Sequence, residues 1–189
     1  MAKKLIRCKW AEKDSLMGLY HDKEWGVPIH DDIKLFEFLL LDSFQAGLSW
    51  STILKKRINF KGAFDNFDFF VIANYSDFDI KRLLNNSQII RNYAKIMATK
   101  INAQKFLEIQ RQYGSFNKYI WKFVNGKSVK NKFKTLSEIP SQSKESNTMS
   151  EDLKRKGFKF VGATICYAFM QAAGLVNDHV VGCFRYNEV

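Results

Sequence analysis

Cysteine and histidine, the side chains that bind transition metals most readily, occur near both ends of the chain. His179 and Cys183 are four positions apart, close enough on one turn to chelate a single ion. Cys8 and His21 would supply two more ligands if the two ends of the chain meet in the fold. Two Cys and two His form a composition typical of structural zinc sites. The spacing of Cys8 and His21 is a weak signal, and the alternative is two buried thiols and two solvated imidazoles.

A second candidate site surrounds Asp42. This residue follows four apolar residues and lies in the last turn of a predicted helix, where the helix dipole disfavours a negative charge. Because a desolvated carboxylate costs free energy unless it has a partner, Asp42 either lies on an exposed edge or has a function. Phe44, Trp50 and the turn Gly47-Leu48 are close by in the sequence. Together these features favour a pocket for a flat, electron-poor ligand.

The segment from Thr148 to Gly174 predicts two helices joined by a short hairpin. Gly157 and Gly162 flank the hairpin, and the first N–H groups of the second helix would form an anion site suited to phosphate. Four basic residues surround it, namely Lys154, Arg155, Lys156 and Lys159. This arrangement resembles the helix-hairpin-helix module, which binds a DNA backbone without reading its sequence. An ordinary helical hairpin with a glycine cap is the alternative.

The elements that must position these residues are predicted to be helices. The central helix lies within residues 31–50, where Asp31 or Asp32 caps its start and Gly47 supplies its end. Its second half is apolar on all sides, so we expect the rest of the protein to surround it. Further helices are predicted over 14–20, 50–57, 60–64, 76–84, 89–112, 115–124, 148–156 and 163–173.

The helix over 148–156 is expected to begin with a capping box formed by Thr148 and Glu151. No segment predicts a strand, and no internal repeat is evident. We therefore expect an all-α fold.

Length and composition indicate one compact domain that associates with a polyanion. The 189 residues are 46% hydrophobic and 15% aromatic, which is ample for a buried core. Seventeen Phe against two Pro argue against a disordered chain. Thirty Lys and Arg against nineteen Asp and Glu give a net charge of +11, which favours nucleic acid before an acidic membrane surface.

We expect a cytoplasmic protein without a membrane association. Met1 to Arg7 is basic, but no apolar segment of a signal peptide follows it. The longest apolar stretch, Val161 to Val176, is too short to span a bilayer. Three Cys is an odd number, and cytosolic thiols stay reduced, so no disulfide framework is expected.

Several blocks of the sequence resemble the DNA-3-methyladenine glycosylase I family. They are Cys8 to Trp10, Tyr20 to Pro28, Gln45 to Trp50, Ile89 to Asn92, Gly157 to Gly162 and Gly174 to His179. The resemblance covers nearly the whole chain. It implies an all-α helix-hairpin-helix DNA glycosylase fold in which a zinc site joins the N- and C-termini. We thus expect one glycosylase domain over residues 1–189, with a helical lobe that holds the hairpin and a lobe formed by the two termini.

The same resemblance implies an activity and a set of site residues. The expected reaction is monofunctional hydrolysis of the N-glycosidic bond of 3-methyladenine in double-stranded DNA, with free 3-methyladenine as the product, by a monomer. The base pocket maps onto Trp10, Tyr20, Trp25, Asp42, Phe44 and Trp50, of which Asp42 and Tyr20 are expected to be catalytic. DNA contacts map onto Gly47, Leu48, Lys159 and Gly162. A structural Zn²⁺ maps onto Cys8, His21, His179 and Cys183.

The sequence departs from the family pattern in the expected pocket. Asp42 stands where reference members carry Glu, Phe44 where many carry Gln, and Met17 where some carry Tyr. These departures bear on base affinity and preference. The alternative function is a zinc-stabilised DNA-binding module that recognises alkylated bases without excising them.

No general base is evident in the sequence. Asp178 falls where other helix-hairpin-helix glycosylases keep a catalytic Asp, but its position beside His179 favours a role as hydrogen-bond partner of a metal ligand. No lysine is placed as a Schiff-base nucleophile, so lyase activity is not expected.

Overall fold

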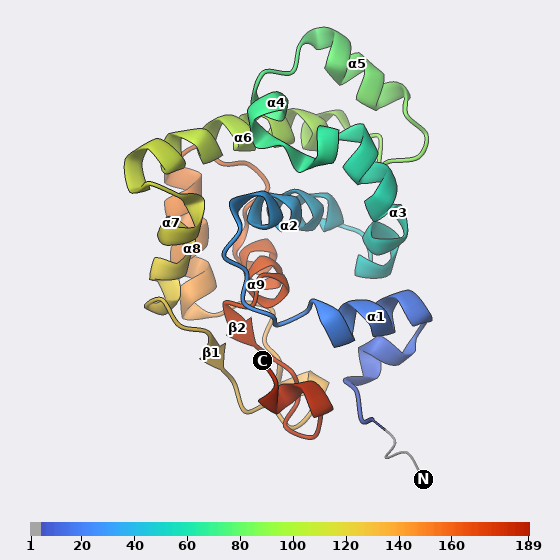
Figure 1. The fold of residues 1–189 in the computed structure, drawn as a ribbon, viewed down its shortest axis with the longest axis vertical. Coiled ribbons are helices and arrows are strands. Elements are labelled where there is room, and N and C mark those ends of the chain that lie inside the picture. Colours follow the sequence, from blue (N-terminus) through green and yellow to red (C-terminus); the bar gives the residue numbers. More distant parts are fainter. Residues whose placement is uncertain (1–4) are drawn as a thin grey trace.

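The computed structural model describes residues 5–189, and within this range the regular secondary structure is almost entirely helical (Figure 1). The expected all-α class is confirmed. The α-helices are α1 (Ser15–Lys23), α2 (Asp32–Gln45), α3 (Trp50–Ala63), α4 (Phe69–Ala73), α5 (Asp77–Asn85), α6 (Tyr93–Tyr113), α7 (Phe116–Trp121), α8 (Lys144–Arg155) and α9 (Ala163–Ala172). Short 3-10 helices cover Lys9–Glu12, Asp65–Phe67, Lys122–Val124, Leu136–Glu138 and Phe184–Asn187.

Helix α2 is the centre of the fold, as its apolar second half predicted. Asp31 caps its start by accepting a hydrogen bond from the backbone N–H of Lys34 at 2.8 Å. The run from Leu35 to Phe44 is buried without a break, because α2 packs against α3, α6, α7 and α9 (Figure 1). Gly47 follows with a φ of +79°, a left-handed conformation that glycine adopts without strain. This glycine turns the chain from α2 into α3.

Two short strands contradict the expectation of a strand-free chain. Strand β1 (Val129–Lys130) pairs in parallel with β2 (Val176–Asn177), with Val129 opposite Val176. Two residues are too few to show the alternation of apolar and polar side chains that marks a strand in a sequence. The pairing joins the loop before α8 to the segment after α9, so it depends on contacts between distant parts of the chain.

Several helix predictions were wrong: the helix predicted over 89–112 begins at Tyr93, and α4 was not predicted. Helix α8 begins at Lys144, about one turn before the predicted start, because Ser143 and Ser146 form the capping box. Thr148 instead donates a hydrogen bond to the carbonyl of Lys144 inside the helix. The two helices predicted over 50–57 and 60–64 are one continuous helix, α3.

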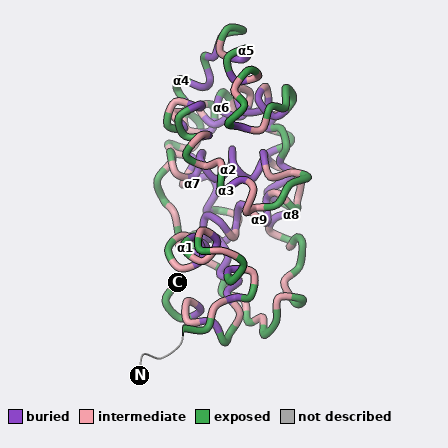
Figure 2. Tube along the Cα trace, turned by 90° about the vertical axis from the view of Figure 1, so that its right-hand side faces the viewer, coloured by how far each residue is buried: buried purple, intermediate pink, exposed green. Residues whose placement is uncertain are grey.

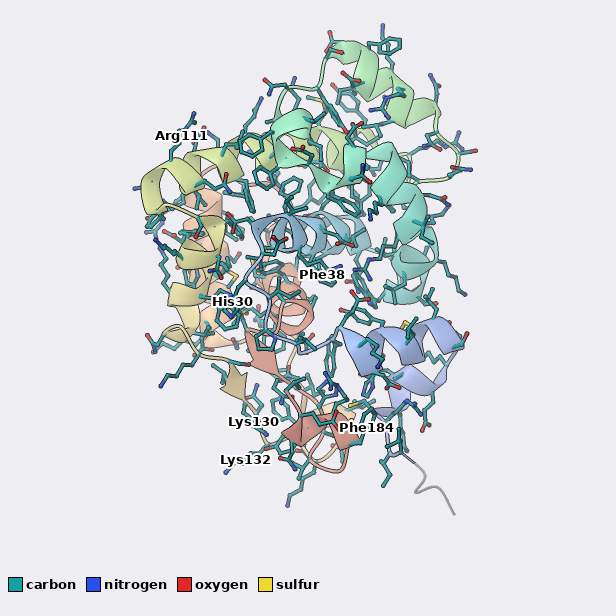
Figure 3. The ribbon with its side chains drawn as sticks, viewed as in Figure 1. His30, Phe38, Arg111, Lys130, Lys132 and Phe184 are labelled. Carbon is teal, nitrogen blue, oxygen red and sulfur yellow. The ribbon has the colours of Figure 1, made fainter. Side chains whose placement is uncertain are left out.

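The first described residues and the C-terminal 3-10 helix approach each other at one end of the molecule (Figure 1). The backbone N–H of Phe184 donates to the carbonyl of Ile6 at 2.9 Å, and Phe184 lies beside the N-terminal segment (Figure 3). Residues 1–4, which include most of the basic start of the chain, lie outside the described range. Buried residues follow the helices that cross the middle of the molecule, and exposed residues follow the outer loops (Figure 2). Within residues 5–189, no helix is long and apolar enough to cross a membrane.

Candidate functional site

A cavity of about 370 Å³ lies between α1, the end of α2, the start of α3 and α9. Trp10, Tyr20, Trp25, Asp42 and Trp50, which the sequence predicted for the base pocket, all line it. Met17, Gln45, Leu136, Ile139, Ala168 and Gln171 complete the lining. The structure therefore brings together five of the six predicted pocket residues from separate parts of the chain.

Asp42 is the one acid among the residues that line the cavity. Its side chain is 1% exposed, and its Oδ2 atom has no hydrogen-bond partner among the described residues. Because no neighbouring cation offsets the loss of water, burial raises the pKa of Asp42 well above its usual range. The desolvation that the sequence predicted for Asp42 is thus observed, without a protein partner for the group.

Aromatic rings form the other walls of the cavity. The Tyr20 ring lies 5.3 Å from that of Trp50 and 6.3 Å from that of Trp10 between centroids, and Trp10 meets Trp25 edge-on at 5.0 Å. Trp50 also has a buried polar atom, Nε1, without a hydrogen-bond partner in the described structure. Burial, followed by the charges of Asp42 and Glu24, raises the pKa of Tyr20 well above its usual range, so its phenol stays neutral. The walls suit a flat heterocycle.

Phe44 does not line the cavity, which corrects the sequence prediction for this residue. It is fully buried, and its ring packs against Phe60 at 4.8 Å and Phe64 at 5.8 Å. Residues two apart on an α-helix are rotated by about 200° about the helix axis, so their side chains lie on nearly opposite faces. Since Asp42 faces the cavity, Phe44 faces the core between α2 and α3 instead.

Five lining residues were not predicted from the sequence. Gln45 lies one turn after Asp42 on α2, so its position on the same face was available from helical spacing. Ala168 and Gln171 belong to α9, and Leu136 and Ile139 belong to the loop between β1 and α8. No local pattern indicates these last four, because they reach the cavity only through tertiary packing.

A partly buried ion-pair network fixes the three helices that carry Tyr20, Asp42 and Trp50. Arg57 on α3 donates to Glu24 after α1 at 2.7 and 2.8 Å and to Glu37 on α2 at 2.6 Å. Burial opposes the charge, but the two carboxylates outweigh it and raise the pKa of Arg57. Its guanidinium also lies 5.3 Å from the centroid of the Phe38 ring, which points from α2 toward α1 (Figure 3). One cation therefore links all three elements.

The four predicted metal ligands are all buried and meet in one cluster. Their candidate ligand atoms, which belong to Cys8, His21, His179 and Cys183, lie within 4.8 Å of one another. The Cys183 sulfur is 3.4 Å from His21 Nε2 and 3.5 Å from His179 Nδ1, and the Cys8 sulfur is 3.8 Å from His179 Nδ1. A tetrahedral zinc ion with ordinary bond lengths to sulfur and nitrogen places such ligand pairs about 3.6 Å apart. The cluster therefore fits a four-coordinate ion.

The protonation of the cluster also suits a metal. The contact between the two sulfurs lowers the pKa of Cys183 and raises that of Cys8, so one thiolate is favoured even among protein atoms alone. His21 Nδ1 lies 2.8 Å from a carboxylate oxygen of Asp22, and His179 Nε2 lies 3.0 Å from the carbonyl of Trp25. Both acceptors favour a proton on the outer nitrogen, which leaves the inner nitrogen unprotonated and able to bind an ion.

Asp22, rather than Asp178, is the acid that supports the cluster, which corrects the expectation for Asp178. Arg7 holds Asp22 through contacts of 2.7 to 3.0 Å. The Asp178 carboxylate accepts hydrogen bonds not from the imidazole of its neighbour but from three other side chains, each at 2.7 Å: Asn131, Tyr167 and Gln171. Adjacency in the sequence was misleading, since successive residues of an extended segment point in opposite directions.

The predicted DNA-contacting residues lie in two separate elements. Gly47 and Leu48 form the turn between α2 and α3, where Leu48 is 40% exposed. Lys159 is exposed on the hairpin between α8 and α9, and Gly162 precedes the first turn of α9 with open space beside its Cα. The first N–H groups of a helix have no partner within the helix, so this end of α9 can accept an anion.

Comparison with known proteins places this site in a family. The family model for methyladenine glycosylase matches residues 10–186. DNA-3-methyladenine glycosylase 1 of Escherichia coli (strain K12) is 48% identical over 180 residues, which cover 95% of this chain and 96% of the relative. A crystal structure of 3-methyladenine DNA glycosylase I matches with a TM-score of 0.92 and 47% identity, covering 95% of this chain and 98% of that chain.

A further solved structure shows what a relative binds. It is a Tyr-to-Phe variant of 3-methyladenine DNA glycosylase I in complex with 3-methyladenine. It matches with a TM-score of 0.91 and 37% identity, and the match covers 94% of this chain and 96% of that chain. Sequence and fold therefore agree over nearly the full length, and this chain belongs to the methyladenine glycosylase family.

Proposed function

We propose that this protein is a monofunctional DNA glycosylase that hydrolyses the N-glycosidic bond of 3-methyladenine in alkylated double-stranded DNA. The observation that carries the proposal is an aromatic cavity lined by Asp42 and Trp50, whose buried Oδ2 and Nε1 atoms have no hydrogen-bond partner among the described residues. Unpaired buried polar atoms are rare in native proteins, and a ligand that supplies a donor and an acceptor would satisfy both. Adenine carries both kinds of group.

The substrate lowers the chemical demand on the enzyme. Methylation at N3 gives the base a positive charge while it is attached to the sugar, so it is already a good leaving group. Extruding the nucleotide from the duplex costs a few kcal/mol, and least for a damaged base. Stacking against Tyr20 and Trp50 offsets part of this cost, and a cationic ring over these faces gains more.

Asp42 is proposed to read the base. Its carboxylate would accept a hydrogen bond from the exocyclic amino group and attract the positive ring. In the free protein, burial disfavours the ionised form of Asp42, as its raised pKa shows. A bound cation compensates the negative charge, so the pocket is better suited to a charged base than to a neutral one.

We propose that no lysine acts as a lyase nucleophile. Among the described residues, none of those that line the cavity is a lysine. Asp178 accepts three hydrogen bonds and is therefore committed to holding α9 and the loop at Asn131. The reaction is thus hydrolysis assisted by the cationic leaving group, with Asp42 and the neutral Tyr20 against the base.

Cys8, His21, His179 and Cys183 are proposed to hold one structural Zn²⁺. Four protein ligands leave no open position, so the ion would supply folding free energy rather than take part in the reaction. Its ligands lie directly behind the pocket wall, because the His21 ring is 5.3 Å from that of Trp10 and the His179 ring is 4.6 Å from that of Trp25. An ion that holds the imidazoles of His21 and His179 in place would therefore also hold the indoles of Trp10 and Trp25 in place.

The turn at Gly47-Leu48 is proposed to press into the duplex beside the lesion, while Lys159 and the Gly162 end of α9 hold the backbone. The net charge of +11 supports this polyanion partner. We further propose that residues 1–189 act as one domain and as a monomer.

Release of the base tests the proposal. The protein is incubated with DNA treated with a methylating agent, and the released bases are separated by chromatography. We expect 3-methyladenine to appear in proportion to enzyme and time. Tight binding to the same DNA with no base released would instead identify a damage-recognition module without catalysis.

A further inference from the structure

Helix α6 contacts the turn that precedes α3 through one buried lysine. The Lys95 ammonium donates to the carbonyl of Phe44 at 2.8 Å and to that of Ala46 at 2.6 Å. The side chain of Lys95 is buried, and these carbonyls, rather than a carboxylate, are its partners. Because the last carbonyls of a helix lack partners within it and carry partial negative charge, the ammonium closes the end of α2. Lys95 thereby fixes the backbone that leads into Gly47-Leu48.

The same helix contacts the hairpin between α8 and α9 through one buried amide. Asn102 Oδ1 accepts from the backbone N–H of Lys159 at 2.8 Å, and Asn102 Nδ2 donates to the carbonyl of Lys159 at 3.0 Å. Both polar atoms of one side chain are thus used on a single hairpin residue. The next residue, Phe160, has a φ of +54°, which is unfavourable for a residue other than glycine. Asn102 therefore holds a hairpin whose backbone is strained.

Lys95 and Asn102 lie on the same face of α6. They are seven residues apart, which is close to two full turns, and they are separated by about 10 Å along the helix axis. Both lie within the unbroken helix of 21 residues from Tyr93 to Tyr113. The distance between the turn and the hairpin is therefore set by a rigid element and not by a loop.

We infer that α6 is the spacer that sets the distance between the duplex-pressing turn and the backbone-binding hairpin, with Lys95 and Asn102 as positioning residues for excision from duplex DNA. This inference rests on the proposed DNA contacts of these two elements. Binding free energy gained at the hairpin can drive a residue into the base stack only if the two elements keep their spacing. A misplacement of about 1 Å is enough to cost about 100-fold in a positioned reaction.

A comparison of duplex and single-stranded substrates separates this role from a general structural one. A base in a single strand needs little extrusion, so its excision depends on the pocket and much less on the turn. We expect Lys95→Met to lower the excision rate from duplex methylated DNA by at least about tenfold, the size expected for losing hydrogen bonds from a charged group. Excision from single-stranded methylated DNA and the affinity for free 3-methyladenine should stay near the wild-type values. Lys95→Arg, which keeps the donors, should recover part of the duplex rate.

Asn102→Ala tests the other end of the spacer. It should weaken binding to unmodified duplex DNA by about tenfold, because the hairpin loses both amide contacts. Two control variants of the same helix leave these contacts in place. Gln104→Ala removes a hydrogen bond that the side-chain amide donates to the carbonyl of Ala73 on α4, and Lys100→Met replaces a half-buried lysine. In both variants the ratio of the excision rates from duplex and single-stranded methylated DNA should equal that of wild type.

Three readouts decide the inference. A larger loss on duplex than on single-stranded DNA in Lys95→Met and Asn102→Ala, with free-base affinity intact, supports it. Equal losses on both substrates, or a matching fall in free-base affinity, would mean that α6 only stabilises the fold, and would overturn it. If wild type itself releases no base from either substrate, the proposed function fails instead, and the duplex affinities of Asn102→Ala and Gln104→Ala still test the hairpin contact.

Discussion

Asp42 and Trp50 line one cavity, and among residues 5–189 neither Asp42 Oδ2 nor Trp50 Nε1 has a hydrogen-bond partner. One is an acceptor and the other a donor, and they come from two helices, α2 and α3, that Arg57 ties together through Glu37. Leaving such atoms unpaired costs the free protein about 1–3 kcal/mol each. A ligand that offers a donor to the carboxylate and an acceptor to the indole N–H would therefore stabilise the protein.

The first prediction concerns the stability of the free protein. We expect Asp42→Asn to melt at a higher temperature than wild type, by a margin that grows as the pH rises. The unfolded chain releases the Asp proton near pH 3.9, whereas burial raises the pKa of Asp42 in the folded protein. Between these two values the folded state alone holds the proton, so the wild-type free energy of unfolding falls with rising pH and levels off above the raised pKa.

Thermal melting of both proteins between about pH 5 and 8 measures this margin. Asp77→Asn, which changes an exposed carboxyl group on α5, is the matched control and should show no such growth. A margin for Asp42→Asn that does not change with pH would show that the carboxyl group is not desolvated in solution.

The second prediction concerns the metal. Protein purified without added zinc should contain one equivalent of zinc, and a chelator should lower its melting temperature. Cys183→Ser should lose the ion, because one of four ligands is removed. Cys166→Ala changes a buried thiol on α9 that lies outside the cluster and should keep the ion. The absence of metal, together with melting that a chelator does not alter, would refute a structural zinc site.

The third prediction concerns the hairpin. Lys159→Ala should weaken binding to all duplex sequences alike and reduce the salt dependence by about one phosphate contact. Excision at saturating DNA should be affected much less. Lys81→Ala, on α5 at the opposite end of the molecule from the termini, is the control (Figure 1). If Lys159→Ala binds duplex DNA as tightly as wild type, the hairpin only connects α8 to α9 and does not bind the DNA backbone through Lys159.

Features encoded locally could be predicted from the sequence. The central helix followed from its apolar run, the cap at Asp31 and the glycine at position 47, all within one short segment. The helix from Asp77 was equally clear, because Ser76 and Asp79 form a capping box. The capping box predicted at Thr148 failed because Ser143 and Ser146 form one about a turn earlier.

Features that depend on distant contacts could not be predicted in the same way. Leu136 and Ile139 reach the cavity from an irregular loop, and the β1 and β2 strands exist only as a pair. Phe44 was assigned to the pocket because it is close to Asp42 in the sequence and because of the family resemblance, whereas helical geometry turns it into the core. Asp22 was part of a recognised block, but its contact with His21 and Arg7 needed the meeting of the two termini.

The central claim is that Asp42 reads the alkylated base, and titration of free 3-methyladenine into wild type and Asp42→Asn by calorimetry tests it most directly. Because Asn keeps the size of the side chain but removes the charge, we expect its affinity to fall by about 1.5–3 kcal/mol, the value of a charged hydrogen bond. Excision should fall in parallel, while duplex affinity persists. Equal affinities of the two proteins for the free base would contradict the claim and assign the recognition of 3-methyladenine to other groups of the pocket.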